Sequence, residues 1–223
     1  MKTLKLLVGA GLALVLAACV LKTTRHTVYL EPDGSVVWTV LEEDVHSDAR
    51  TAVDRRKEEC DWLAAVHAGE HGVARGLALL GGDPVSRVLR SERPFVVWTE
   101  ARFDSFEELA TRLVSDLQLP ARLDVDSGAG GGGFTLELDL AAAEGMDGGD
   151  NPLIELLDGI ENARLVLPEG EFVSAEGFEL DENRRTARPL APPDEVLEAK
   201  AGTIRWSLHW TTARNAANPP PLG

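Results

Sequence analysis

Apolar residues at every second position constrain the fold of this chain more than any other feature. Successive side chains of a β-strand point to opposite faces of a sheet, so this alternation predicts strands with one buried face. It is clearest in residues 203–212 and again in 134–140. The apolar members are Ile204, Trp206, Leu208 and Trp210 in the first segment, and Phe134, Leu136, Leu138 and Leu140 in the second. The pattern indicates antiparallel sheets with one face turned to solvent.

Turn and capping residues divide the rest of the chain into hairpins and helices. Asp33-Gly34 lies between two alternating segments and predicts a β-hairpin over 26–42. Ser47 is placed to cap a helix that runs to about Ala68, and the capping box Ser105 to Glu108 opens a helix to Leu119. Further helices are expected at 71–80 and 152–160, and further strands at 85–90, 94–103, 123–126, 163–167, 171–180 and 184–188. The predicted fold class is α+β, with antiparallel sheets built from hairpins and two or three packed helices.

The N-terminal residues predict where the protein is located in the cell. A short positive region precedes the apolar run Leu6–Leu16. As a helix this run measures about 16 Å, roughly half of a hydrocarbon core, which is typical of a signal peptide rather than a membrane span. It ends in Leu16-Ala17-Ala18-Cys19, which resembles the lipobox of bacterial lipoproteins. The resemblance implies cleavage after Ala18 and acylation of Cys19, the alternatives being a plain secretory signal or an uncleaved anchor.

Lipidation at Cys19 sets the expected domain organisation. Residues 1–18 are the signal peptide, 19–26 a lipidated tether, 27–213 a single α+β domain and 214–223 a disordered tail. The chain has two cysteines, so Cys60 is then the one free thiol and no intramolecular disulfide is possible. Its apolar neighbours Trp62 and Leu63 predict that Cys60 is buried.

The charge balance argues against nucleic acid as a partner. The 37 acidic residues outnumber 22 basic ones and give a net charge of −15, whereas phosphate binding needs clustered Lys and Arg. Removing residues 1–18 deletes two lysines and no acid, so the mature chain carries −17. The expected location is the extracytoplasmic bacterial cell envelope, with the membrane as a partner through the N-terminal lipid. Val20 stands where Asp would indicate inner-membrane retention, which favours the outer membrane if the host has one.

One histidine string is a candidate metal site. His67-Ala68-Gly69-Glu70-His71 matches the HxxEH signature of inverted-motif zinc metallopeptidases, in which two histidines hold Zn²⁺ and the glutamate activates water. Residues four apart share a helix face, but Gly69 and Gly72 disfavour a helix here. A zinc-dependent hydrolase using His67, Glu70 and His71 is therefore the alternative to a pair of surface histidines at a helix break. The sequence indicates no other cofactor.

Apolar residues indicate binding rather than chemistry. The predicted helix 152–160 is crowded with large aliphatic side chains, and Trp206 and Trp210 lie on one face of the last strand. Together they are candidates to line a pocket or lid for a lipid-like ligand. An ordinary hydrophobic core is the alternative for the tryptophans. No motif for nucleophilic catalysis is present in the sequence.

Two stretches of strand pattern carry a resemblance to a known family. Val28–Leu30 with Val36–Val40, and Leu165–Pro168 with Phe172–Gly177, resemble the corresponding strands of LppM-like bacterial lipoproteins. The resemblance implies a secreted α+β domain with a lipid-related role. The sequence as a whole predicts a membrane-anchored extracytoplasmic lipoprotein, a non-enzymatic binding module for an envelope partner or an apolar ligand. A purely structural envelope component and the zinc hydrolase remain the alternatives.

Overall fold

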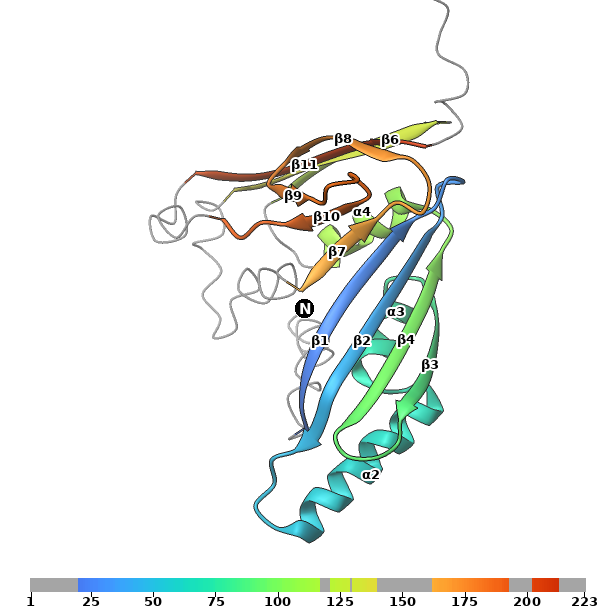
Figure 1. Ribbon diagram of the computed structural model, residues 1–223, viewed down its shortest axis with the longest axis vertical. Coiled ribbons are helices and arrows are strands. Elements are labelled where there is room, and N and C mark those ends of the chain that lie inside the picture. Colours follow the sequence, from blue (N-terminus) through green and yellow to red (C-terminus); the bar gives the residue numbers. More distant parts are fainter. Residues whose placement is uncertain (1–19, 117–120, 129, 140–161, 193–201, 213–223) are drawn as a thin grey trace, which may run out of the picture. The chain divides into compact units, whose positions relative to one another are not determined.

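The structure is a computed structural model that describes residues 20–116, 121–128, 130–139, 162–192 and 202–212 (Figure 1). Its helices are α2 (Ala52–Ala68), α3 (Gly72–Leu79) and α4 (Phe106–Asp116). Its strands are β1 (Val20–Leu30), β2 (Val36–Ser47), β3 (Asp83–Arg90), β4 (Phe95–Phe103), β5 (Ala121–Gly128), β6 (Gly131–Asp139), β7 (Ala163–Val166), β8 (Glu171–Glu176), β9 (Phe178–Leu180), β10 (Thr186–Pro189) and β11 (Thr203–Thr211). The fold is mixed α+β and rich in antiparallel pairing, as predicted.

The chain divides into two compact units. Unit 1 comprises Met1–Arg25 and Thr39–Ala101, and unit 2 comprises His26–Trp38 and Arg102–Gly223. This division differs from the single domain expected over 27–213. In unit 1 the strands are ordered β3-β4-β2-β1, and Figure 1 shows α2 and α3 on one face of this sheet.

Local backbone conformation and capping explain where helix α2 of unit 1 begins and ends. Thr51 is the N-cap of α2, because its extended backbone lets its hydroxyl accept a hydrogen bond from the Asp54 N–H. The prediction that Ser47 caps this helix was wrong, since Ser47 is the last residue of β2. The predicted end at Ala68 is confirmed: Gly69 follows in the left-handed conformation with φ 69°, and α3 starts only at Gly72.

Unit 2 contains the predicted hairpin turn and a second sheet. Residues 31–35 join β1 to β2, with Gly34 at φ 89° and the Asp33 carboxylate accepting from Ser35. The second sheet has the order β5-β6-β11-β8, and β5 and β6, which contain the strands predicted at 123–126 and 134–140, form an antiparallel pair with Gly128 opposite Gly131. In α4 the Glu108 N–H lies 3.4 Å from the Ser105 hydroxyl, as the capping box predicts.

Two strand predictions need correction. β7 pairs in parallel with β1, with His26 opposite Ala163, so the pairing is not antiparallel throughout. The long chain between these strands permits this, because parallel neighbours need an extended crossover. The strand predicted over 171–180 is interrupted at Gly177, whose φ of 73° separates β8 from β9.

Buried apolar residues confirm the alternation in the last strand. Ile204, Trp206, Leu208 and Trp210 all belong to the core, and Phe172 of β8 is fully buried beside them in the register of β8 with β11. Phe106 of α4 packs against Trp210 and Phe134, with ring centroids 5.7 and 5.5 Å apart. The tryptophans of β11 are therefore core residues of unit 2, as the ordinary-core alternative predicted.

Two further sequence predictions are wrong, and several others concern residues outside the described ranges. The tether predicted over 19–26 is wrong from Val20 onwards, because those residues form the first part of β1. Cys60 is exposed rather than buried, since it lies on the outward face of α2. Cys19, the helix predicted at 152–160, the signal peptide and the tail over 214–223 lie outside the described residues.

Candidate functional site

The three residues of the HxxEH string are separated by the break between α2 and α3. His67 is exposed in the last turn of α2, and Glu70 is exposed in the connection, 3.5 Å from the Arg75 guanidinium. His71 is the buried N-cap residue of α3. The string therefore does not form the continuous helix that would place both imidazoles on one face.

His71 points into unit 1 and is already engaged there. Its Nε2 lies 3.2 Å from Glu42 Oε2 and 3.3 Å from the Thr99 hydroxyl, and Trp62 packs edge-on against its ring. Across the described parts of the chain, no group of three or more His, Cys, Asp or Glu side chains is arranged to hold a metal ion. Zinc binding by His67, Glu70 and His71 stays a prediction that this arrangement does not support.

A cluster of polar side chains lies inside unit 1, where the alternation of β2 predicts an apolar residue. Glu42 follows Val36, Trp38 and Val40 at two-residue spacing and is fully buried. Lys22 of β1 donates a hydrogen bond to Glu42 Oε1, and the Thr99 hydroxyl of β4 lies 3.1 Å from that of Ser86 in β3. We call Lys22, Glu42, His71, Thr99 and Ser86 the buried polar cluster. It joins all four strands of unit 1 to the start of α3.

The alternation of β2 changes two residues after Glu42. Asp44 has a φ of 53°, a left-handed conformation that aspartate tolerates better than most residues. Glu42 belongs to the even-numbered alternation that precedes this irregularity, whereas Val45 and Ser47 are buried after it, at odd-numbered positions. An acidic residue at an apolar position, followed by an aspartate two residues on, is the sequence signal that reveals this site.

The electrostatics of the cluster favour an ionised Glu42. Burial by itself raises the pKa of the Glu42 carboxyl, because a charge is poorly solvated in the interior. The hydrogen bond from His71 and the charge and hydrogen bond of Lys22 outweigh burial, so the pKa lies below its ordinary value of 4.5. The carboxylate is thus held as the negative partner of a buried ion pair.

The geometry of the cluster differs from that of a catalytic triad. In a triad the histidine uses one ring nitrogen for the nucleophile and the other for the carboxylate. Here Thr99 and Glu42 both approach Nε2 of His71, while Nδ1 has no hydrogen-bond partner among the described residues. Thr99 and Glu42 are also fully buried. The cluster therefore lacks the geometry of a triad, and its contacts link the sheet to the start of α3.

The opposite face of the unit 1 sheet is free of described helices. Ser86 of β3 points toward the cluster, so Val85, Arg87 and Leu89 alternate to the other side, where Val85 and Leu89 are exposed. The Arg87 guanidinium lies 5.6 Å from the centroid of the Trp98 ring on the neighbouring strand β4. We call Leu21, Val85, Arg87, Leu89 and Trp98 the helix-free face. It presents separated apolar side chains with an aromatic and cationic centre.

Two hollows lie on the surface of the described residues. The larger, about 710 Å³, lies at the β1–β2 turn of unit 2, and half of its lining residues are charged, namely Glu31, Asp33, Arg102, Asp104 and Glu169. The smaller, about 340 Å³, lies on the outward face of α2 and has a mainly apolar lining. The larger hollow has the wrong lining for an apolar ligand.

The fold and these sites define a mixed α+β protein with a structural polar cluster and an exposed sheet face. Comparison with known protein families finds no match, and comparison with curated proteins finds none either. Among solved structures, the chain is similar to the folded domain of LppM from Mycobacterium tuberculosis, at 12% identity and a TM-score of 0.36. The likeness covers 87% of this chain and 92% of that one.

Within the described ranges, no helix is both long and apolar enough to span a membrane.

Proposed function

We propose that this protein is a lipid-anchored lipoprotein of the bacterial envelope that acts as a non-enzymatic binding module. The observation that carries the proposal is Leu16-Ala17-Ala18-Cys19, followed without a spacer by the first residue of β1. Acylation of Cys19 ties unit 1 directly to a membrane. Val20, rather than Asp, after the cysteine supports the outer membrane where the host has one.

An envelope protein is the partner that the surface supports best. Trp206 and Trp210, the candidates for an apolar pocket, are core residues of unit 2. The helix-free face, in contrast, leaves Val85 and Leu89 exposed next to Trp98 and Arg87. Aromatic and arginine side chains surrounded by apolar residues are the typical composition of protein interfaces.

The anchor is tested by replacing the acylated residue. We expect Cys19→Ser to abolish incorporation of labelled palmitate and to move the protein from the membrane fraction to the soluble fraction, because several acyl chains are lost together. Cys60→Ser is the matched control and is expected to change neither result. Globomycin, which blocks lipoprotein signal peptidase, is expected to accumulate the precursor of the wild-type chain. Retention of Cys19→Ser in the membrane without palmitate would contradict the proposed anchor.

The binding surface is tested by cross-linking in cells. A photoreactive amino acid at Leu89, on the helix-free face, is expected to yield discrete adducts with an envelope protein. The same amino acid at Leu79, which is exposed at the end of α3, is the matched control and is expected to yield none. The adducts at Leu89 are expected to disappear on Trp98→Ala, which removes the neighbouring aromatic ring. Adducts of equal strength at both positions would contradict the proposed surface.

A further inference from the structure

The start of β1 determines how closely the anchor holds unit 1 to a membrane. This inference rests on the proposed acylation of Cys19. Val20 is the first residue of β1, and Lys22 is fixed to the buried carboxylate of Glu42. At about 3.3 Å per residue, Lys22 lies roughly 10 Å along the chain from Cys19. Because Lys22 is paired with the buried Glu42 carboxylate, the start of β1 cannot separate from the sheet without breaking this ion pair.

Other elements share this end of unit 1. β1 and β2 are neighbours in a hairpin, so the start of β1 lies beside the end of β2. The N–H of Ser47, at that end, donates to Glu59 Oε1 of α2 over 3.0 Å. Arg93, between β3 and β4, contacts the same Glu59 carboxylate at 2.5 Å and the Ser47 carbonyl at 3.3 Å. We call this region the tether-proximal end; Figure 1 shows the start of α2 and the β3–β4 turn there.

The first turns of α2 expose an unusual surface at the tether-proximal end. Val53 is 77% exposed, and Arg56, Lys57 and Cys60 are exposed beside it. Their spacing of three and four residues places them on one side of the helix. With Ala52 they line the smaller hollow, which thus contains two cations and no carboxylate. We call these five residues the α2 outer face.

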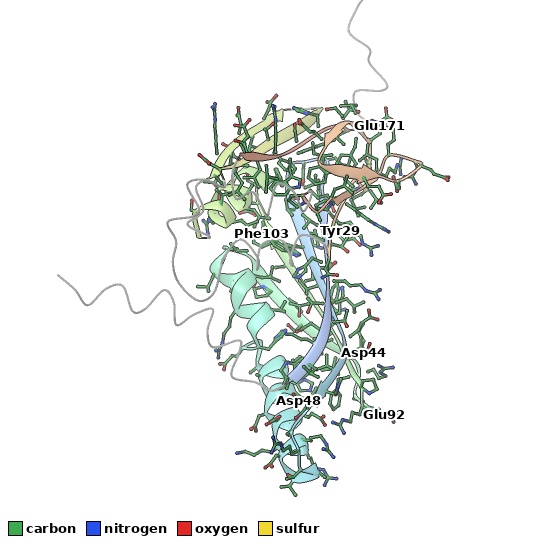
Figure 2. The ribbon with its side chains drawn as sticks, turned by 90° about the vertical axis from the view of Figure 1, so that its left-hand side faces the viewer. Tyr29, Asp44, Asp48, Glu92, Phe103 and Glu171 are labelled. Carbon is green, nitrogen blue, oxygen red and sulfur yellow. The ribbon has the colours of Figure 1, made fainter. Side chains whose placement is uncertain are left out.

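Charge distinguishes the α2 outer face from its surroundings. The chain carries a net charge of −15, and anionic lipid therefore repels most of its surface. Asp44, Asp48 and Glu92 are exposed carboxylates at the same end of the unit (Figure 2). The α2 outer face is a part of this end that combines positive charge with an exposed aliphatic side chain, a composition suited to the headgroup region of a bilayer.

We propose that the α2 outer face contacts the phospholipid headgroups of the membrane that holds the Cys19 lipid. Val53 enters the interfacial region, while Arg56 and Lys57 lie level with the lipid phosphates. The contact fixes the orientation of unit 1, so that the far end, where β3 begins, is directed away from the bilayer. The partner of this surface is the anionic phospholipid of the anchoring leaflet.

The proposal is tested with depth-sensitive fluorescence on the lipidated full chain. The protein is reconstituted in vesicles of phosphatidylcholine and phosphatidylglycerol that contain nitroxide-labelled phosphatidylcholine. A single NBD label is placed at Val53→Cys or at Leu79→Cys, each in a Cys60→Ser background. Leu79, 75% exposed, precedes β3 and so lies at the far end of unit 1. We expect several-fold stronger quenching at position 53, reduced by Arg56→Glu with Lys57→Glu.

The outcomes separate the surface from the anchor. If the protein fails to float with the vesicles, the proposed lipidation of Cys19 is wrong, and the proposed lipid contact of the α2 outer face, which rests on it, is wrong as well. If it floats but positions 53 and 79 are quenched equally, or position 53 is not quenched, the anchor stands and the α2 outer face is not the lipid contact. The soluble Cys19→Ser form, added to the same vesicles, is expected to show no quenching at position 53.

Discussion

Replacing Glu42 with glutamine is expected to lower the free energy of unfolding by about 3 kcal/mol. Glu42 is fully buried and is the only carboxylate in the buried polar cluster as defined above. Its loss leaves the Lys22 ammonium close to an uncharged amide and deprives His71 of its charged partner. Breaking one half of a largely buried ion pair is costly, because the Lys22 ammonium, whose side chain is 23% exposed, loses its counter-charge with little water to replace it.

The neighbouring glutamate provides the matched control for this substitution. Glu43 pairs with Arg25 at 3.1 Å on the other side of β2, and both side chains are partly exposed, at 31% and 55%. Water and salt screen such a pair, so Glu43→Gln is expected to cost less than about 1 kcal/mol. Urea denaturation of both variants, in the soluble Cys19→Ser background, measures the difference. Equal losses for the two variants would show that the buried polar cluster does not stabilise unit 1.

The same substitution has an expected pH dependence. The pKa of Glu42 is lowered in the folded protein from an ordinary value of 4.5, so the folded state holds the ionised form more strongly than the unfolded state does. Its stabilising contribution is complete above the unfolded pKa and is lost as the pH falls through the folded pKa. The stability difference between wild type and Glu42→Gln should therefore be constant near neutral pH and shrink below about pH 4.5.

Local patterns predicted the elements that local forces determine. The alternation in 203–212 predicted which side chains of β11 are buried, because strand geometry alone sets that periodicity. The end of α2 at Ala68 was predictable because Gly69 adopts the left-handed conformation there. The start of α2 was misplaced, because Ser47 and Thr51 are both good N-caps and only the length of β2 decides between them.

The candidate sites depend on contacts between distant residues, which explains why sequence reasoning missed them. Lys22 and Glu42 are 20 positions apart, and His71 and Thr99 are 28 apart. The HxxEH string drew attention to His71, but its partners lie on other elements. The parallel pairing of β1 with β7 joins residues that are much farther apart in the sequence, such as His26 and Ala163. Glu42 alone could be recognised from the sequence, because it is an acidic residue at a position where the alternation of the strand predicts a buried apolar side chain.

Lys22 of β1 lies between the proposed anchor and the buried polar cluster. Lys22, which the buried cluster holds, is three residues from the proposed lipid site. Force on the anchor therefore acts on a strand that Glu42 secures in the interior of unit 1. The α2 outer face and the helix-free face belong to the same unit, so the proposed lipid contact at one surface would orient the other toward the proposed envelope partner.

Replacing Phe172 with alanine is expected to lower the free energy of unfolding by about 3–5 kcal/mol, an effect confined to the packing of unit 2. The Phe172 side chain is fully buried in β8, opposite Trp210 of β11. Its backbone is fixed at the same time, because its N–H donates to the Arg184 carbonyl over 2.8 Å and its own carbonyl accepts from Arg184 Nε at 2.7 Å. The fixed backbone limits collapse around the missing ring, so a cavity remains.

Val173, the next residue of β8, is the control for this prediction because its side chain is about half exposed. Val173→Ala is expected to change the free energy of unfolding by about 0.5 kcal/mol or less, since little apolar contact is lost. Tryptophan fluorescence during urea denaturation follows both variants, because Trp206 and Trp210 lie in the strand beside β8. A loss below about 1 kcal/mol for Phe172→Ala would mean that neighbouring side chains refill the site, and that β8 and β11 are less tightly packed than their burial indicates.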